Sequence, residues 1–132
     1  MIEFKLNADI SVEQFVQLLK DSSLAERRPV DDWECMEGML ANANLTYSAW
    51  SKGHLVGIAR SVTDFHFACY LSDLAVSLDY QSQGIGKSLM DMTQSQLKPS
   101  CKLILLAAPD ANDYYPKHGF EHNPRCWVRL GR

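Results

Sequence analysis

The sequence lacks the features that mark metal-binding, secreted and membrane-spanning proteins. Its four cysteines are far apart and form no CxxC pair, so we expect no metal site. They lie within apolar runs, which is typical of buried free thiols in a reducing compartment. No apolar run approaches the roughly 18 residues of a membrane span, and Glu3 and Lys5 interrupt the stretch in which a signal peptide would be apolar. We therefore expect a cytoplasmic protein with no membrane partner.

An excess of basic residues is also missing. Thirteen Lys and Arg residues against 16 Asp and Glu residues give a net charge of −3 at pH 7. Proteins that bind nucleic acids usually carry a basic face, so we expect no nucleic-acid partner. The chain has 132 residues, 46% of them hydrophobic, and contains no repeat, linker or low-complexity segment. These properties predict a single domain over residues 1–132.

Four segments in the first part of the chain have the composition of β-strands. Lys52 and Gly53 separate two of them, as the turn of a hairpin would. The expected strands span residues 2–6, 45–50, 54–62 and 66–76.

Two amphipathic helices are expected before the hairpin. Over residues 10–22, Ser11 and Gln14 have the spacing of a capping box. Over residues 31–43, Asp31 is expected to cap the helix. The residues expected on the inward face of this second helix are Trp33, Met36, Leu40 and Ala43.

The segment after residue 76 has the pattern of a strand–helix–strand unit. Apolar residues recur at helical spacing from Ile85 until Pro99 stops the helix. Residues 101–108 are apolar except for Lys102, as in a strand covered on both faces. A strand, a helix and a second strand in this order predict a parallel pair of strands.

The C-terminal segment is expected to return to the sheet. Residues 111–118 should form a short helix that Gly119 closes in a left-handed conformation. Residues 120–130 are expected to form one or two final strands.

Two glycines, Gly84 and Gly86, precede and open the helix that begins near Ile85. The first N–H groups of a helix lack intrahelical partners, and glycines let a phosphate approach them closely. A tight turn that only brings the helix close to the sheet would have the same composition. A P-loop would need a glycine where Gln81 stands, and a dinucleotide fingerprint would need a small residue in place of Leu89, so neither motif fits.

A third pattern fits the glycines. Gln81, Gly84 and Gly86, after the segment LSDLAV, resemble the acetyl-CoA signature of the GNAT superfamily of N-acetyltransferases. The segment YYPKHGF, residues 114–120, resembles the second hallmark of that family, an aromatic residue and Tyr followed by Gly-Phe. The resemblance implies a mixed α/β (α+β) fold, with a strongly twisted central sheet of about six to seven strands and about four helices.

The resemblance also implies acetyl-CoA as cosubstrate. In the family the pyrophosphate lies on the backbone of the glycine turn, and the pantothenate arm pairs with the strand that precedes it. One backbone N–H of that strand would serve as the oxyanion donor. Asn112 is the candidate for the family's asparagine, although it comes later in the chain than usual. The implied cofactor-binding residues are Leu74, Ala75, Val76, Gln81, Ser82, Gln83, Gly84, Ile85, Gly86, Lys87, Ser88 and Asn112.

Two residues are candidates for the proton transfers. Tyr115 matches the family's tyrosine that protonates the departing thiolate, and a core aromatic is the alternative. Alternation places Asp73 on an apolar face with Cys69, Leu71 and Ala75. A carboxylate there would hold a proton more readily, which suits a general base. A β-bulge that shifts the alternation, or a purely structural role for Asp73, stays open as the alternative.

The function that the resemblance implies is acetyl transfer from acetyl-CoA to a primary amine of a small molecule or peptide, by direct attack. The alternative is a non-catalytic acyl-CoA-binding sensor or interaction module, which would need neither Tyr115 nor Asp73. The loop between the first two helices borders the acceptor pocket in this family, and Arg27, Arg28, Asp31 and Asp32 lie near it. Helix capping and ordinary surface charge are the alternative for the two aspartates. The terminal segment CWVRL is compatible with a homodimer formed by strand pairing.

Overall fold

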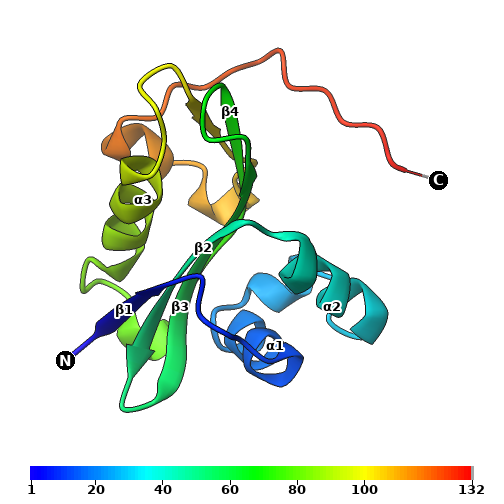
Figure 1. The fold of residues 1–132 in the computed structure, drawn as a ribbon, viewed down its shortest axis with the longest axis vertical. Helices are drawn as coiled ribbons and strands as arrows, with labels where there is room; N and C mark the ends of the chain where they lie inside the picture. Colours follow the sequence, from blue (N-terminus) through cyan, green and yellow to red (C-terminus); the bar gives the residue numbers. More distant parts are fainter. Residues whose placement is uncertain (132) are drawn as a thin grey trace.

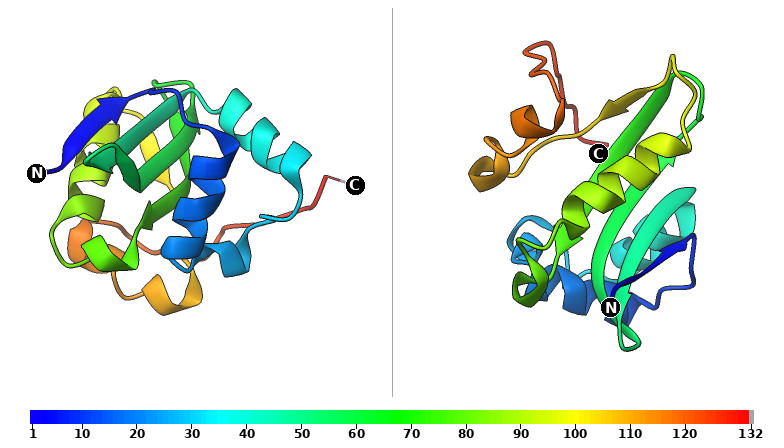
Figure 2. Two further views of the ribbon diagram at one scale, coloured as in Figure 1. Left: turned by 90° about the horizontal axis from the view of Figure 1, so that it is seen from below. Right: turned by 90° about the vertical axis from the view of Figure 1, so that its left-hand side faces the viewer.

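The computed structural model describes residues 1–131 and shows one sheet with helices on both faces (Figures 1 and 2). The strands lie in the order β1-β2-β3-β4-β5, antiparallel except for the pair β4–β5. The strands are β1 Glu3–Leu6, β2 Leu45–Ser51, β3 His54–Thr63, β4 Ala68–Val76 and β5 Lys102–Ile104. The α-helices are α1 Val12–Asp21, α2 Trp33–Asn42 and α3 Ile85–Ser95. The 3-10 helices are η1 Leu24–Arg27, η2 Leu78–Tyr80, η3 Pro109–Ala111 and η4 Tyr115–His118.

Two hydrophobic layers hold the helices to the sheet. Helices α1 and α2 cover one face, and α3 covers the other (Figure 2). The layer under α1 and α2 buries Phe15, Leu18, Leu19, Met36, Ile58 and Ala75. The layer under α3 buries Ala49, Val56, Ala59, Leu71, Ile85, Leu89 and Met90. Among the α-helices of residues 1–131, none combines the length and the apolar composition that a membrane crossing requires.

Several local predictions are confirmed. The Ser11 side chain accepts from the Gln14 N–H at 3.1 Å, and the Gln14 side chain accepts from the Ser11 N–H at 2.9 Å, which completes the capping box. The hairpin turns at Lys52 and Gly53 with φ of 51° and 81°, as a two-residue turn with both central residues left-handed requires. Gly119 closes η4 with φ of 86°.

The predicted start of α2 is wrong by one residue. Asp32, not Asp31, is the N-cap, and its side chain accepts from the Cys35 N–H at 3.0 Å. Met36 is fully buried and Leu40 and Ala43 are half-buried, as predicted. Trp33, the first residue of the helix, is 48% exposed instead of facing inward.

The prediction of six to seven strands and four helices is wrong for residues 1–131, where there are five strands and three α-helices. The expected buried strand over residues 101–108 is reduced to β5, and both Lys102 and Ile104 are exposed. Residues 120–131 contain no helix or strand. A strand needs a hydrogen-bonded neighbour. The three residues of β5 offer too few backbone groups for residues 120–130 to pair with.

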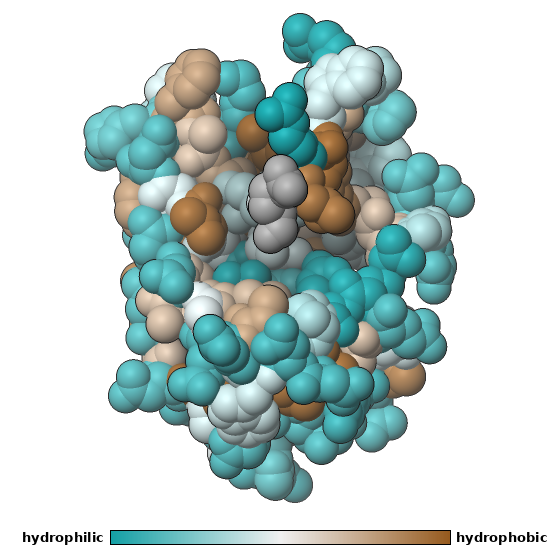
Figure 3. All heavy atoms as spheres, turned by 90° about the vertical axis from the view of Figure 1, so that its right-hand side faces the viewer, coloured by the Kyte–Doolittle hydropathy of each residue, from teal (hydrophilic) through white to brown (hydrophobic). Residues whose placement is uncertain are grey.

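The C-terminal segment instead runs away from the sheet as an extended chain (Figure 1). Trp127, Val128 and Leu130 on it are 90%, 71% and 86% exposed. Apolar side chains gather in the upper half of the face drawn in Figure 3, on the side where α2 and the C-terminal segment lie in Figure 1.

The cysteines are free, but only Cys69 is fully buried. Cys35 and Cys126 are exposed and Cys101 is half-buried, so the prediction of four buried thiols is wrong. Cys35 lies on the outward face of α2, and Cys126 lies on the extended C-terminal segment.

Strand β4 is only partly paired on the side away from β3. Its first residues, 68–70, pair with residues 102–104 of β5. Beyond Ile104 the chain leaves β4, and the two strands diverge (Figure 2, right). Residues 71–76 therefore have no strand partner on this side among the described residues, and only side chains bond to the backbone there, at the Ser72 and Val76 carbonyls. We call this stretch the free edge of β4.

The packing of α3 on the sheet depends on Gly57 in β3. A Cβ at this position would lie 3.2 Å from Ile85 Cγ2, 3.2 Å from Leu89 Cδ1 and 3.3 Å from Ala49 Cβ. These distances are shorter than ordinary contacts, so the absence of a side chain lets the helix approach the strand closely.

We expect Gly57→Val to lower the free energy of unfolding by about 1–3 kcal/mol, because an isopropyl group would overpack this contact. Urea unfolding measures the change. Gly38→Ala is the control, since Gly38 lies within α2 with nothing within 4 Å of its added Cβ. It should raise stability by about 0.5–1 kcal/mol. A Gly57→Val protein as stable as wild type would contradict the close approach.

Candidate active site

A β-bulge in β4 divides the strand into two parts with opposite side-chain phase. Ser61 of β3 pairs with Leu71, but the preceding Arg60 pairs with Asp73, so Ser72 is the extra residue. Leu71 packs in the layer under α3, whereas Ala75 packs in the layer under α1 and α2. The prediction that Asp73 shares a face with Leu71 by strict alternation is therefore wrong, because the bulge intervenes.

The bulge aims Asp73 at two arginines. Asp73 Oδ2 accepts from Arg60 Nε at 2.6 Å, and Asp73 Oδ1 accepts from Arg28 Nε at 2.5 Å. Arg60 comes from the facing strand, and Arg28 comes from the loop after η1. Asp73 is fully buried, but its surroundings are ionic rather than apolar, so the premise of the general-base prediction is wrong.

The same arginines hold the backbone at the bulge. Arg28 Nη2 donates to the Ser72 carbonyl at 2.8 Å, and Arg60 Nη2 donates to Ser72 Oγ at 3.0 Å. Arg60 Nη1 also donates to the Met39 carbonyl of α2 at 2.8 Å. One carboxylate and two guanidinium groups thus join β3, β4, α2 and the loop after η1. We call Arg28, Arg60 and Asp73 the ionic cluster.

The glycine turn leads from β4 into α3. Gly84 has φ of 81°, a left-handed conformation that favours glycine, and it occupies the N-cap position. No side chain caps the helix, and its first hydrogen bond runs from the Ser88 N–H to the Gly84 carbonyl at 3.0 Å. The N–H groups of the first helical residues, 85–87, therefore point out of the helix start without an intrahelical partner.

The position of this turn is set by a contact with β4. The Gln81 side chain donates to the Val76 carbonyl at 3.0 Å. The turn residues themselves, 81–84, are exposed, so a ligand can reach the helix start. This is the strand-to-helix turn that the sequence predicted.

Two tyrosines stand beside the turn. A Cβ placed on Gly86 would lie 3.1 Å from the Tyr114 hydroxyl oxygen, so glycine at 86 also makes room for Tyr114. Tyr115 is half-buried, and its ring meets those of Tyr114 and Phe120 edge to face at 5.3 Å and 5.4 Å. Burial, and to a smaller extent Tyr114, raise the pKa of the Tyr115 phenol above its usual value.

The remaining predicted residues are less closely grouped. Leu74 and Val76 are half-buried and pack against the layer under α3, while Ala75 is buried on the opposite face. Asn112 is exposed at the end of η3. The structure thus brings β4, the glycine turn and Tyr115 together, and leaves Asn112 at the surface.

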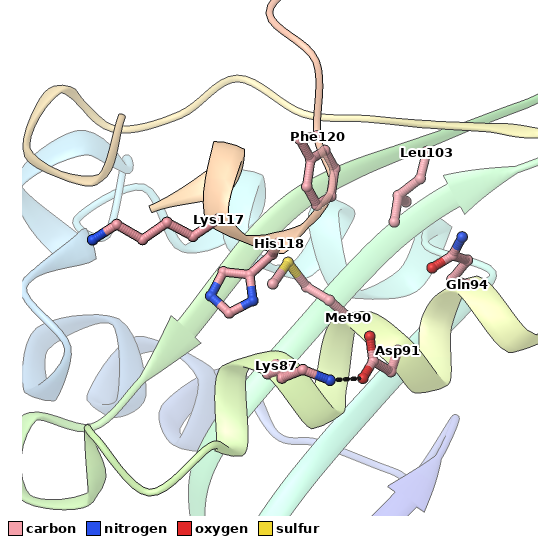
Figure 4. Close-up of a pocket in the computed structure, with 8 residues that line it drawn as sticks. All are labelled: Lys87, Met90, Asp91, Gln94, Leu103, Lys117, His118 and Phe120. Atoms are coloured by element: carbon pink, nitrogen blue, oxygen red, sulfur yellow. Dashed lines mark hydrogen bonds and ion pairs between the residues drawn. The ribbon is translucent and has the colours of Figure 1, made fainter. Parts of the chain in front are cut away.

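A cleft of about 260 Å³ continues the site along α3 (Figure 4). Helix α3 forms one wall, and β5 and the segment around η4 form the other. Lys87 pairs with Asp91 across one helical turn at 2.7 Å, as drawn in Figure 4. The lining residues are Lys87, Met90, Asp91, Gln94, Leu103, Lys117, His118 and Phe120.

The sequence analysis missed the role of Arg60. An arginine within the apolar segment of β3 is itself a signal, because a buried charge requires a partner. Arg60 is 4% exposed. The sequence does not show that Asp73 is this partner, or that Arg28 joins them.

The comparisons with known proteins agree with this geometry. Residues 9–126 match the family model described as an acetyltransferase (GNAT) domain. The uncharacterized N-acetyltransferase ycf52 of Gracilaria tenuistipitata var. liui is 30% identical over 127 residues, which cover 90% of this chain and 70% of that protein.

Solved structures share the fold. A probable acetyltransferase of unknown function from methicillin-resistant Staphylococcus aureus superposes with a TM-score of 0.79 at 22% identity, covering 98% of this chain and 100% of that one. The aminoglycoside N-acetyltransferase AAC(6')-Iy, in complex with a bisubstrate analogue, gives a TM-score of 0.73 at 17% identity, covering 100% and 99% of the two chains. Since the family model spans most of the chain and the relative is aligned over nearly all of it, the chain belongs to the GNAT acetyltransferase family.

Proposed function

We propose that the protein transfers an acetyl group from acetyl-CoA to a primary amine of a small molecule or peptide, by direct attack of the amine. The observation that carries the proposal is the free edge of β4, residues 71–76, which ends at an exposed helix start with unpaired N–H groups. Tyr115, which packs against the same hydrophobic layer as Leu74 and Val76, supplies a proton donor nearby.

The residues present fit coenzyme A. Residues 81–88 would hold the pyrophosphate through backbone N–H groups at the positive end of the α3 dipole. The free edge at residues 74–76 would bind the amides of the pantetheine arm as an added strand. Lys117 and His118, in the cleft beside α3, would lie near the phosphates. When bound, acetyl-CoA supplies the thioester that the amine attacks.

Tyr115 would then return a proton to the sulfur. Because burial raises the pKa of its phenol, the donor stays protonated at neutral pH. The amine, by contrast, must lose its proton before it can attack. The rate should therefore climb with pH through the neutral range and should not fall there.

Asp73 suits a different role from the one that the sequence suggested. Both of its oxygens accept hydrogen bonds from guanidinium groups, so we propose that it positions Arg28 and the β4 bulge. The proton of the amine would leave to solvent. A general-base role for Asp73 stays a prediction that the measurement below tests.

The second candidate function is a non-catalytic module that binds acyl-CoA. The same pyrophosphate site at residues 81–88 would serve it, but a binding module would not need the half-buried Tyr115, whose hydroxyl has no hydrogen-bond partner within residues 1–131. AAC(6')-Iy, which shares the fold, has been solved with an analogue that joins CoA to an acetylated neamine, and this supports catalysis.

We further propose one catalytic domain over residues 1–132, in the cytoplasm. The exposed side chains of Trp127, Val128 and Leu130 support a homodimer.

We expect coenzyme A to bind with a Kd in the micromolar range, measured by titration calorimetry. Gly86→Trp should abolish binding, because an indole would fill the space between Tyr114 and the helix start. Its thermal unfolding is the control for folding, since Gly86 is only half-buried. No heat of binding with wild-type protein, or unchanged affinity in Gly86→Trp, would contradict the proposed pyrophosphate site at residues 81–88.

Tyr115→Phe should lower the rate of acetyl transfer about 10²–10⁴-fold, the usual effect of removing a positioned acid. Affinity for coenzyme A should change little. Tyr114→Phe is the matched control and should retain most of the activity. Single-turnover kinetics establish that chemistry is being measured. A Tyr115→Phe enzyme with the wild-type single-turnover rate would show that Tyr115 is a packing residue.

Asp73→Asn should lower the free energy of unfolding by about 3–5 kcal/mol, because it leaves two buried or half-buried arginines without a counter-ion. Urea unfolding measures this. Asp91→Asn removes an exposed partner of Lys87 and should lower it by less than about 1 kcal/mol. If Asp73→Asn is as stable as wild type while kcat/KM falls and its pH profile climbs more steeply than the wild-type profile, Asp73 is the general base instead.

A further inference from the structure

The ionic cluster carries more positive than negative charge. Asp73 contributes one carboxylate, while Arg28 and Arg60 contribute two guanidinium groups. Arg60 is enclosed, with its side chain 5% exposed, whereas the side chain of Arg28 is 21% exposed. The excess positive charge therefore reaches the surface through Arg28.

Arg28 also has donors to spare. A guanidinium group has five N–H bonds. Arg28 uses one on Nε for Asp73, one on Nη2 for the Ser72 carbonyl and one on Nη1 for the Arg27 carbonyl. Within residues 1–131, two N–H groups of Arg28 have no hydrogen-bond acceptor. Three contacts fix the plane of the guanidinium, so these two donors are held in place before any ligand binds.

The position of Arg28 links it to the proposed reaction. It touches β4 at Ser72 and Asp73, where the free edge for the pantetheine arm begins. It comes from the loop between α1 and α2, so it stands on the side of β4 opposite to α3 and the glycine turn. An amine that attacks a thioester held along this edge would thus lie close to a fixed, partly exposed guanidinium.

We propose that Arg28 binds a carboxylate of the acceptor, so that the enzyme acetylates amines that carry a carboxylate a few bonds away in preference to polycationic amines. The proposal rests on the acetyl transfer proposed above. A guanidinium and a carboxylate form charge-assisted, bidentate hydrogen bonds. The same excess charge would repel an acceptor that carries several ammonium groups, as polyamines and aminoglycosides do.

Two other roles for Arg28 make different predictions. If Arg28 only holds the fold together, its removal lowers stability and affects all acceptors alike. If its free N–H groups instead bind the thioester oxygen, its removal lowers the chemical rate equally for acceptors with and without a carboxylate. Only a contact with the acceptor changes the ratio between the two kinds of acceptor.

The experiment compares pairs of acceptors that differ only in the carboxylate. L-Phenylalanine and L-phenylalaninamide form one pair, L-leucine and L-leucinamide the second, and spermidine represents the polycations. We expect kcat/KM, expressed per neutral amine, to be roughly 10- to 100-fold higher for each acid than for its amide, as for hydrogen bonds to charged groups. In Arg28→Gln this ratio should fall to about one.

Two variants serve as controls. Arg28→Lys keeps the charge but not the bidentate geometry, so it should retain part of the preference. Lys20→Gln makes the same change of charge at an exposed position at the end of α1, and its ratio should equal that of wild type. Thermal unfolding and coenzyme A binding of each variant show whether the fold is intact. If Arg28→Gln does not fold, the wild-type ratio and Arg28→Lys still decide the question.

The outcomes separate this proposal from the proposed function. A wild-type enzyme that acetylates amines but treats acids and amides alike, or prefers spermidine, overturns the carboxylate contact and leaves acetyl transfer standing. A loss in Arg28→Gln that is equal for all acceptors also overturns it. A wild-type protein that binds coenzyme A and acetylates no amine overturns the proposed function. In that case N-acetyl-L-phenylalanine should still bind to the CoA-loaded protein more tightly than its amide does, and equal calorimetric affinities would overturn the contact.

Discussion

The buried contact of Asp73 with Arg28 and Arg60 is the interaction on which the geometry of the site depends. It joins the middle of β3, the bulge of β4, helix α2 and the loop after η1, and so ties the helical side of the fold to the two central strands. Burying three charges is costly, so such a cluster is weak grounds for high stability. What the cluster determines instead is the geometry of the site. Both arginines also bond to Ser72, and this holds β4 at the point where its side-chain phase changes.

Strand β4 has three parts with different roles, and the turn that opens α3 follows it. Residues 68–70 pair with β5, Ser72 forms the bulge, residues 74–76 keep a free edge, and the turn that follows opens α3. A strand bonded on both sides along its whole length would leave no backbone groups for a ligand. The short β5 is therefore part of the site, because its early end exposes the β4 edge while the helices on both faces keep that edge inside the fold.

Local chemistry explains which features the sequence predicted well. The capping box of Ser11 and Gln14, the Lys52–Gly53 turn and the left-handed Gly119 each depend on neighbouring residues, so their patterns are visible in a short window. The bulge and the ionic cluster depend on pairing across strands and on Arg28, which lies 45 residues from Asp73. Strict alternation of side chains along β4 therefore placed Asp73 on the same face as Leu71, which the bulge prevents. The apolar composition of residues 101–108 and 120–130 suggested strands, but composition does not supply a partner strand.

The charge balance of the cluster has a consequence for the chemistry of an acceptor with a carboxylate. In a free α-amino acid the carboxylate stabilises the adjacent ammonium ion and so delays the loss of its proton. When the carboxylate pairs with the Arg28 guanidinium, that stabilisation is weakened, since the negative charge is shared with a second cation. The contact that orients the acceptor would therefore also favour the neutral amine that attacks. In this arrangement a site without a free carboxylate base can still present a reactive amine, while Asp73 remains bound to its two arginines.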